Sequence, residues 1–95
     1  MTANEVPIAL FRLGHIVATP NALGRLSQHD MLRGIQRYQA GDWGDVDDQD
    51  RQANDAALTN GRRLLSVYHS EKQVRFWIIT ESDRSVTTVL MPEDY

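Results

Sequence analysis

Residues 41–55, with the sequence GDWGDVDDQDRQAND, constrain the fold most because they separate two halves with different apolar spacing. Before this segment, apolar residues recur at the spacing of a helix. After it, three runs rich in β-branched and aromatic residues follow one another. Gly41 ends a helix at little cost because glycine adopts the left-handed conformation freely. We therefore expect a helical front half and a back half that forms a sheet.

The front half is expected to contain one strand and three helices. Thr19 can cap a helix that starts at Pro20, where a missing N–H costs nothing. Ser27 repeats this start signal, with Asp30 three residues later in a variant of the capping box. After the GDWG turn, Asp45 can cap the third helix. The predicted ranges are 9–18 for the strand and 20–26, 28–39 and 46–59 for the helices.

The back half is expected to be a meander of three strands. They are predicted at residues 64–70, 73–81 and 85–91. Alternation in the middle strand places Val74, Phe76 and Ile78 on one face and Arg75, Trp77 and Ile79 on the other. Helices should cover one face, and the loop of Trp43 or another subunit should partly cover the second. The order β-α-α-α-β-β-β predicts an α+β fold with a four-stranded, mainly antiparallel sheet and its helices on one face.

Size and composition fit a single α+β domain over residues 1–95, with residues 1–7 as a frayed tail. The chain has no cysteine, which removes thiolate chemistry and suits the reducing cytoplasm. No segment is apolar for long enough to be a signal peptide or a membrane span. We expect a soluble, cytoplasmic protein, and its small size favours a homodimer or another partner.

The formal net charge is −3, but the charge is unevenly distributed. Six of the 13 acidic residues lie within residues 42–55, where Arg51 is the only base. The overall sign disfavours direct nucleic-acid binding, which needs a basic face. Arg33 and Arg37 lie together on the polar side of the predicted second helix. The charge pattern thus indicates a local acidic patch on an otherwise slightly basic chain.

The acidic cluster is a candidate for Mg²⁺ or Ca²⁺ because these cations take several oxygen ligands. However, no start within residues 42–50 satisfies the ligand spacing of an EF-hand. Capping and first-turn positions of the third helix account for Asp45, Asp47 and Asp48. We therefore expect no metal and no cofactor, and keep an acidic surface that contacts a basic partner as the alternative.

No catalytic residues are predicted, since the chain lacks known nucleophile and phosphate-loop motifs. The three histidines are His15, His29 and His69, and no metal-binding spacing joins them. His15 and His69 could meet if their strands were neighbours, which would permit a general base. A small metal-dependent hydrolase or nuclease, using the cluster from Asp42 to Asp47 with a histidine, therefore stays open.

Trp43, held between two glycines, is the predicted centre of a partner-binding surface, because tryptophan is frequent at binding hot spots. The alternative is that Trp43 covers the end of the core and fixes a turn. Arg84 is either a contact residue or part of a turn, paired with Glu81. The predicted partner-binding residues are Asp42, Trp43, Asp45, Asp47, Trp77 and Arg84.

The motifs GHIVATPNAL, GDWGDVDDQD and WIITESDRSVTTVLMPEDY together resemble a family of small bacterial proteins carried on plasmids and other mobile elements. Members are often labelled "type I restriction endonuclease subunit M". A methylation subunit needs a glycine-rich cofactor motif and an NPPF-like loop, and neither is present in this sequence. The resemblance implies a genomic habitat and carries over no site residues.

These observations predict a non-enzymatic protein-interaction module of mobile-element type. The specific hypothesis is an inhibitor of host defence, with an anti-restriction or anti-CRISPR role, that binds a protein partner through its acidic and Trp43 patch. Two alternatives stay open, namely the metal-dependent enzyme and a structural homodimer that buries Trp77 and Ile79 between sheets.

Overall fold

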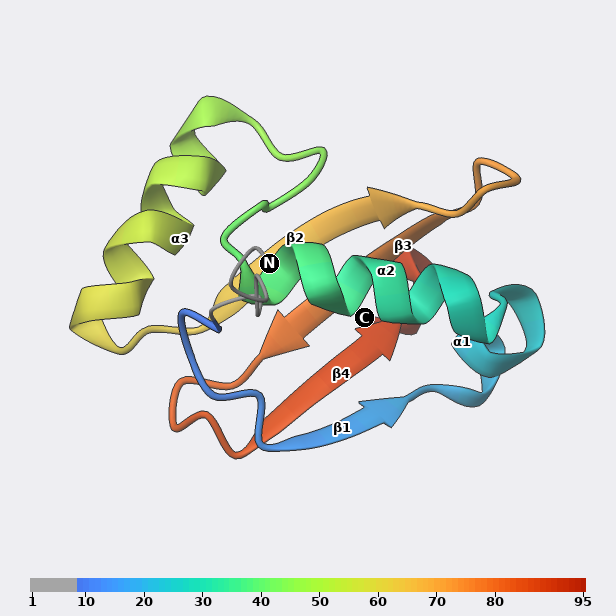
Figure 1. The fold of residues 1–95 in the computed structure, drawn as a ribbon, viewed down its shortest axis with the longest axis horizontal. Coiled ribbons are helices and arrows are strands. Elements are labelled where there is room, and N and C mark those ends of the chain that lie inside the picture. Colours follow the sequence, from blue (N-terminus) through green and yellow to red (C-terminus); the bar gives the residue numbers. More distant parts are fainter. Residues whose placement is uncertain (1–8) are drawn as a thin grey trace, which may run out of the picture.

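Four strands and three helices make up the fold of residues 9–95, the part of the chain that the computed structural model describes (Figure 1). The predicted frayed tail, residues 1–7, lies outside the described residues. The strands are β1 (His15–Ala18), β2 (Leu64–His69), β3 (Arg75–Thr80) and β4 (Val86–Leu90). The helices are α1 (Pro20–Arg25), α2 (Gln28–Gln39), α3 (Asp48–Asn60) and the short 3-10 helix η1 (Pro92–Asp94).

The sheet has the strand order β1-β4-β3-β2. β2, β3 and β4 pair antiparallel, whereas β1 lies parallel to β4. The predicted α+β class is confirmed, with one detail added. The three helices carry the chain from β1 at one edge to β2 at the other, and the returning meander then brings β4 beside β1 in the same direction.

The first two helices begin at the predicted caps. Thr19 Oγ1 accepts a hydrogen bond from the backbone N–H of Ala22 at 3.1 Å. Ser27 Oγ accepts from the N–H of Asp30 at 3.0 Å and donates to the Asp30 carboxylate at 2.9 Å. Each bond satisfies a helix N–H that has no partner within the helix. Local cap chemistry therefore sets both starts.

The predicted start of the third helix is wrong, because its cap is Asp47 and not Asp45. Asp47 Oδ1 accepts from the N–H of Asp50 at 2.7 Å. The N–H of Asp45 instead donates to the carbonyl of Val67 in β2 at 2.8 Å. This bond holds Asp45 beside the sheet edge, so the helix begins at Asp48, two residues later than predicted. Gly61 ends α3 in the left-handed conformation, with φ of 76°.

The predicted strand at residues 9–18 is too long at its start. The N–H of Leu10 donates to the carbonyl of Gln39, at the end of α2, at 2.9 Å. β1 starts only at His15, whose N–H donates to the carbonyl of Ser85 at 2.9 Å. The earlier residues therefore follow the helix end and not the sheet.

α2 crosses one face of the sheet, and α3 lies beside β2 (Figure 1). The core between them contains side chains from all three helices and from β2, β3 and β4. Its buried members are Leu13, Ala22, Leu26, Tyr38, Trp43, Ala57, Leu64, Tyr68, Phe76, Ile78, Val89 and Met91. The two halves of the chain thus share one continuous core.

A chain of buried hydroxyl groups runs through this core. Tyr38 Oη donates to Thr80 Oγ1 at 2.8 Å, Thr80 Oγ1 lies 2.7 Å from Thr87 Oγ1, and Thr87 Oγ1 donates to the Leu13 carbonyl at 2.7 Å. Because Thr87 uses its only proton on this carbonyl, Thr80 must donate to Thr87. The direction of every proton in the chain is thereby set, and the chain connects α2, β3, β4 and the residues before β1.

The outer edge of β2 is closed by other parts of the chain. Val67 donates to the carbonyl of Trp43 at 3.4 Å and accepts from the N–H of Asp45. The side chain of Asn54, from α3, bonds to both backbone groups of Leu65, at 2.8 and 3.2 Å. These contacts satisfy the outward backbone groups of Leu65 and Val67, which would otherwise be open to another strand.

Candidate functional site: the groove between α2 and the β2–β3 hairpin

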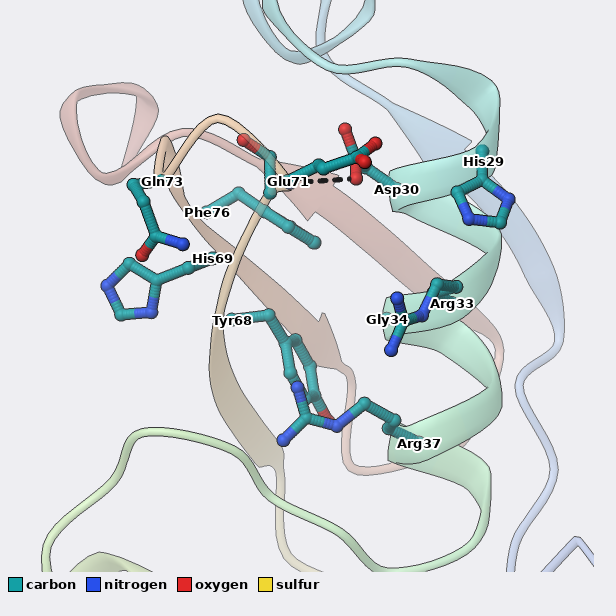
Figure 2. Close-up of a pocket in the computed structure, with 11 residues that line it drawn as sticks. His29, Asp30, Arg33, Gly34, Arg37, Tyr68, His69, Glu71, Gln73 and Phe76 are labelled. Carbon is teal, nitrogen blue, oxygen red and sulfur yellow. Dashed lines mark hydrogen bonds between the residues drawn. The ribbon is translucent and has the colours of Figure 1, made fainter.

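A groove of about 350 Å³ lies between α2 and the hairpin formed by β2 and β3 (Figure 2). We call it the α2–hairpin groove. Charged, imidazole and amide side chains form its walls, and aromatic rings form its floor. The lining residues are His29, Asp30, Arg33, Gly34, Arg37, Tyr68, His69, Ser70, Glu71, Gln73 and Phe76.

The floor of the groove depends on the small size of Gly34. A methyl group at this position would lie 3.0 Å from two ring carbons of Phe76 and 3.3 Å from Ile78 Cδ1. The helix therefore approaches the sheet closely at this turn. Phe76 and Tyr68 are both buried, and their rings are in contact at a centroid distance of 5.9 Å with their planes tilted by 42°. A close helix and two fixed rings give the groove a rigid floor.

Arg37 is held in place on the wall of the groove. Its Nε and Nη2 atoms donate to the two oxygens of Asp42 at 2.7 and 3.2 Å. Its guanidinium carbon also lies 4.9 Å from the centre of the Tyr68 ring, in a cation–π contact (Figure 2). The Arg37 guanidinium lowers the pKa of Asp42, and the hydrogen bonds to Asp42 raise the pKa of Arg37. Two of the five N–H donors face Asp42, and within residues 9–95 the others have no hydrogen-bond partner.

Arg33 lies one helical turn before Arg37 and extends from α2 toward the groove (Figure 2). Within residues 9–95, its guanidinium has no ion pair and no hydrogen-bond partner. Residues four apart share one helix face, so the two guanidinium groups belong to the same wall. The groove therefore contains one cation fixed by Asp42 and one that is unpaired in the described chain.

The opposite end of the groove is acidic. The Asp30 carboxylate accepts from the backbone N–H of Glu71 at 3.0 Å and from the Ser27 hydroxyl at 2.9 Å. These hydrogen bonds, that to Glu71 first, lower the pKa of Asp30. Asp30 thereby joins the start of α2 to the hairpin turn (Figure 2). One end of the groove is basic, and the other is closed by an acidic contact.

The strand order separates His15 from His69. His15 lies on β1 and His69 on β2, and these strands are the two opposite edges of the sheet. The condition under which the two imidazoles could meet, neighbouring strands, is therefore not fulfilled. His69 Nε2 lies 4.0 Å from Asp45 Oδ2, and Asp42 is paired with Arg37. Within residues 9–95, no three His, Asp or Glu side chains converge as a metal site would require.

The structure places Trp43 inside the core. Its side chain is 3% exposed and packs against the rings of Phe11 and Tyr38, at centroid distances of 6.0 and 5.8 Å. Its Nε1 atom donates to Asp55 Oδ1, on α3, at 2.9 Å. Trp43 therefore joins the end of α2 to α3, and its ring is not available on the surface.

Arg84, another predicted contact residue, donates hydrogen bonds to backbone carbonyls near the end of α3. Its Nη2 atom donates to the Ala57 carbonyl at 2.9 Å, and its Nη1 atom donates to the Arg62 carbonyl at 2.8 Å. It also donates to the backbone carbonyl of Glu81 at 3.2 Å, and not to its carboxylate. The Ala57 carbonyl also accepts from the N–H of Gly61, so Arg84 adds a charged donor at the C-terminal end of the helix, where the helix dipole favours a cation.

The six predicted partner-binding residues do not form one surface. Asp45 and Asp47 are exposed near the start of α3, and Asp42 is paired with Arg37. Trp77 lies on the sheet face opposite α2, half-buried against the ring of Tyr95 at 5.4 Å. The residues that line the groove were visible in the sequence only as the i, i+4 pair Arg33 and Arg37, which the pattern places on the polar side of a helix.

Comparisons with known proteins identify no relative: no family model, curated protein or solved structure matches the chain. Over the described range, 9–95, no helix combines the length and apolar character that a membrane crossing requires. The function is therefore inferred from the groove itself.

Proposed function

We propose that this protein is a non-enzymatic interaction module that binds a carboxylate-bearing segment of a protein partner in the α2–hairpin groove. The observation that carries this proposal is the arrangement of Arg33 and Arg37 on one wall. One guanidinium is fixed and the other has no partner within residues 9–95. Arginine matches the planar geometry of a carboxylate and can bind it through two parallel hydrogen bonds.

The fixed position of Arg37 favours binding. Ordering a flexible arginine side chain on association costs about 0.5–1.5 kcal/mol. Asp42 and the Tyr68 ring already order this side chain before any partner arrives. Arg33 then supplies the charge that the chain itself does not neutralise. A carboxylate that lies between the two guanidinium groups interacts with both of them, and only the Arg33 side chain must be ordered on binding.

The acidic end of the groove favours one orientation of a bound ligand. Glu71 lies opposite the arginine wall, beside the Asp30 contact (Figure 2). A bound segment is therefore favoured when its carboxylate lies at the arginine end and its polar or basic groups lie near Glu71. Complementary charges of this kind determine specificity and association rate more than affinity.

The resemblance to mobile-element proteins suggests the class of partner. A small module of this habitat would act in the cytoplasm against a component of host defence, such as a restriction or CRISPR enzyme. In this proposal the partner contacts the groove, and the acidic residues at the start of α3 lie beside it as secondary contacts. The homodimer and enzyme alternatives would each require a different surface.

The proposal is tested by titrating the ¹⁵N-labelled protein with tetraglutamate, and with tetraglutamine as a neutral control. Tetraglutamate is expected to shift the amide signals of Gly34 and His69 and the side-chain Nε–H signal of Arg33. Even weak binding, with Kd of about 1 mM, corresponds to about 4 kcal/mol and is measurable by this method.

Two variants make the test specific. Arg33→Ala should weaken tetraglutamate binding at least several-fold, because it removes the unpaired cation. Arg12→Ala removes another exposed arginine, which lies outside the groove, and should bind as the wild type does. Equal binding of tetraglutamate and tetraglutamine, or equal losses in the two variants, would overturn the proposal.

A further inference from the structure

We propose that the acidic segment of the partner binds in the α2–hairpin groove as an added strand, which pairs with the backbone of His69 at the outer edge of β2. This inference rests on the proposed function and names the conformation in which the ligand is bound. The observation that carries it is a single gap in an edge that the chain otherwise closes. His69 lies in that gap and lines the groove.

The outward backbone groups of β2 follow a regular alternation. In an antiparallel pair, every second residue directs its N–H and C=O groups away from the partner strand. Leu65 and Val67 direct theirs outward, where α3 and the loop before it bond to them. His69 is the next residue in this series. Within residues 9–95, neither of its outward groups has a hydrogen-bond partner.

The gap is bounded on both sides. Before it, the N–H of Asp45 donates to the Val67 carbonyl at 2.8 Å, and the chain then leaves the edge for α3. After it, the N–H of Glu71 donates to the Asp30 carboxylate at 3.0 Å. An added segment therefore pairs with one residue of β2, and from His69 it continues toward the hairpin turn.

The chain's own residues 42–45 show how such a segment binds. Gly44 forms an isolated parallel bridge with Val67. Two residues earlier, the Asp42 carboxylate accepts two hydrogen bonds from Arg37 on α2, at 2.7 and 3.2 Å. One segment thus combines a backbone bridge to the edge of β2 with a carboxylate on an arginine of α2. The segment of the partner repeats this combination at the next position along both walls.

The two walls of the groove match in spacing, because α2 and β2 run in opposite directions (Figure 1). The Arg37 guanidinium lies over the Tyr68 ring at one end, and Asp30 contacts the hairpin turn at the other (Figure 2). Arg33 lies between these contacts, at the level of His69. Four helical residues advance about 6.0 Å, and two strand residues advance about 6.6–6.8 Å. One step between the arginines therefore matches one step between outward residues of β2.

Alternation along the added strand determines which side chain reaches the arginine. The residue that pairs with His69 has its side chain on the face away from α2, as His69 itself has. The next residue toward the hairpin turn points to the α2 side, where Arg33 has no ion pair within residues 9–95. An acidic residue there pairs with Arg33 while its neighbour is held by backbone hydrogen bonds. Main-chain bonds thus give affinity, and the arginine gives specificity.

The test compares tetraglutamate with its N-methylated analogue, in which each backbone N–H is replaced by an N-methyl group. Both probes carry the same carboxylates, but only tetraglutamate can donate a backbone hydrogen bond to the His69 carbonyl. NMR titration should give a dissociation constant at least several-fold higher for the analogue. Binding through side chains alone would give equal dissociation constants for the two probes.

Hydrogen exchange of single amides provides a second readout. At saturating tetraglutamate, the N–H of His69 should exchange several-fold more slowly than in the free protein, because a carbonyl of the ligand accepts it. The N–H of Val67 already donates to the Trp43 carbonyl at 3.4 Å and should change little. It is the matched control on the same edge.

The outcomes separate this inference from the groove proposal. Slower exchange at His69 together with weaker binding of the analogue supports the strand pairing. If tetraglutamate binds but the His69 amide is not protected, or if the analogue binds equally well, the pairing is overturned and the groove proposal stands. If tetraglutamate does not bind, the groove proposal fails and the pairing fails with it.

Discussion

Replacing Thr87 by valine tests the buried hydroxyl chain, which couples α2 to β3, β4 and the residues before β1. Valine has nearly the same shape as threonine, so the substitution opens no cavity. It leaves two buried groups without partners, the hydroxyl proton of Thr80 and the carbonyl of Leu13. Each such group costs about 1–3 kcal/mol. We therefore expect Thr87→Val to lower the free energy of unfolding by about 2–6 kcal/mol, a large share of the 5–15 kcal/mol typical of small proteins.

The assigned direction of the hydroxyl hydrogen bonds also predicts a smaller loss of stability for Tyr38→Phe. Tyr38→Phe removes only the first donor in the chain, and Thr80 keeps its own donation to Thr87. The hydroxyl's bond to Thr80 and its longer contact with the Leu64 carbonyl are lost, but no donor is stranded, so we expect a loss of about 0.5–1.5 kcal/mol. Thr88→Val is the control, since Thr88 lies on the same strand but faces away from the chain of hydroxyls.

Urea unfolding, followed by tryptophan fluorescence, measures these differences. With a slope of about 1–3 kcal/mol per molar urea, the Thr87→Val midpoint should fall by at least about 0.7 M, and the Thr88→Val midpoint should hardly move. If Tyr38→Phe destabilises the protein as much as Thr87→Val does, the assigned order of donors and acceptors is refuted.

Three further predictions follow from contacts that the sequence did not reveal. Trp43→Ala should destabilise the protein by about 3–5 kcal/mol, as measured by urea unfolding, because a buried ring leaves a cavity and Asp55 loses its donor. Arg84→Ala should destabilise it by about 1–3 kcal/mol because it removes the charged donor to the carbonyls of Ala57 and Arg62, and hydrogen exchange should localise the change to that end of the helix. Arg37 lowers the pKa of Asp42 from the ordinary value of 3.8. The ionised Asp42 carboxylate therefore stabilises the fold above about pH 4, and this stabilisation is lost as the pH falls through the lowered pKa. Asp42→Asn should make the free energy of unfolding less dependent on pH in this acid range.

Local chemistry made much of the fold predictable. Thr19 and Ser27 determine helix starts through side-chain bonds within a few residues, and alternation identified all three strands of the meander. Asp45 and Asp47 show that local sequence alone does not determine which residue caps a helix. Both are good caps, and the choice between them depends on a hydrogen bond from Asp45 to β2, which is distant in sequence. The same limit applies to β1, whose parallel pairing depends on where the meander returns.

The candidate site was harder to predict because its two walls come from separate parts of the chain. The i, i+4 spacing of Arg33 and Arg37 was visible in the sequence, but the position of the hairpin opposite them was not. The position of Trp43 was hard to predict for the same reason. A tryptophan between two glycines suits either an exposed contact or a covered turn, and the carboxylate that receives its N–H lies on the next helix. Tertiary contacts decide both questions.

The central claim is that Arg33 makes the α2–hairpin groove selective for a carboxylate, and a reversal of its charge tests this most directly. The measurement is the ratio of affinities for tetraglutamate and tetralysine, determined by NMR titration for the wild type and for Arg33→Glu. We predict that the wild type prefers tetraglutamate and that the variant prefers tetralysine, with both sets of shifts centred on Gly34 and His69. An unchanged preference in Arg33→Glu, or shifts that lie outside the groove, would contradict the claim.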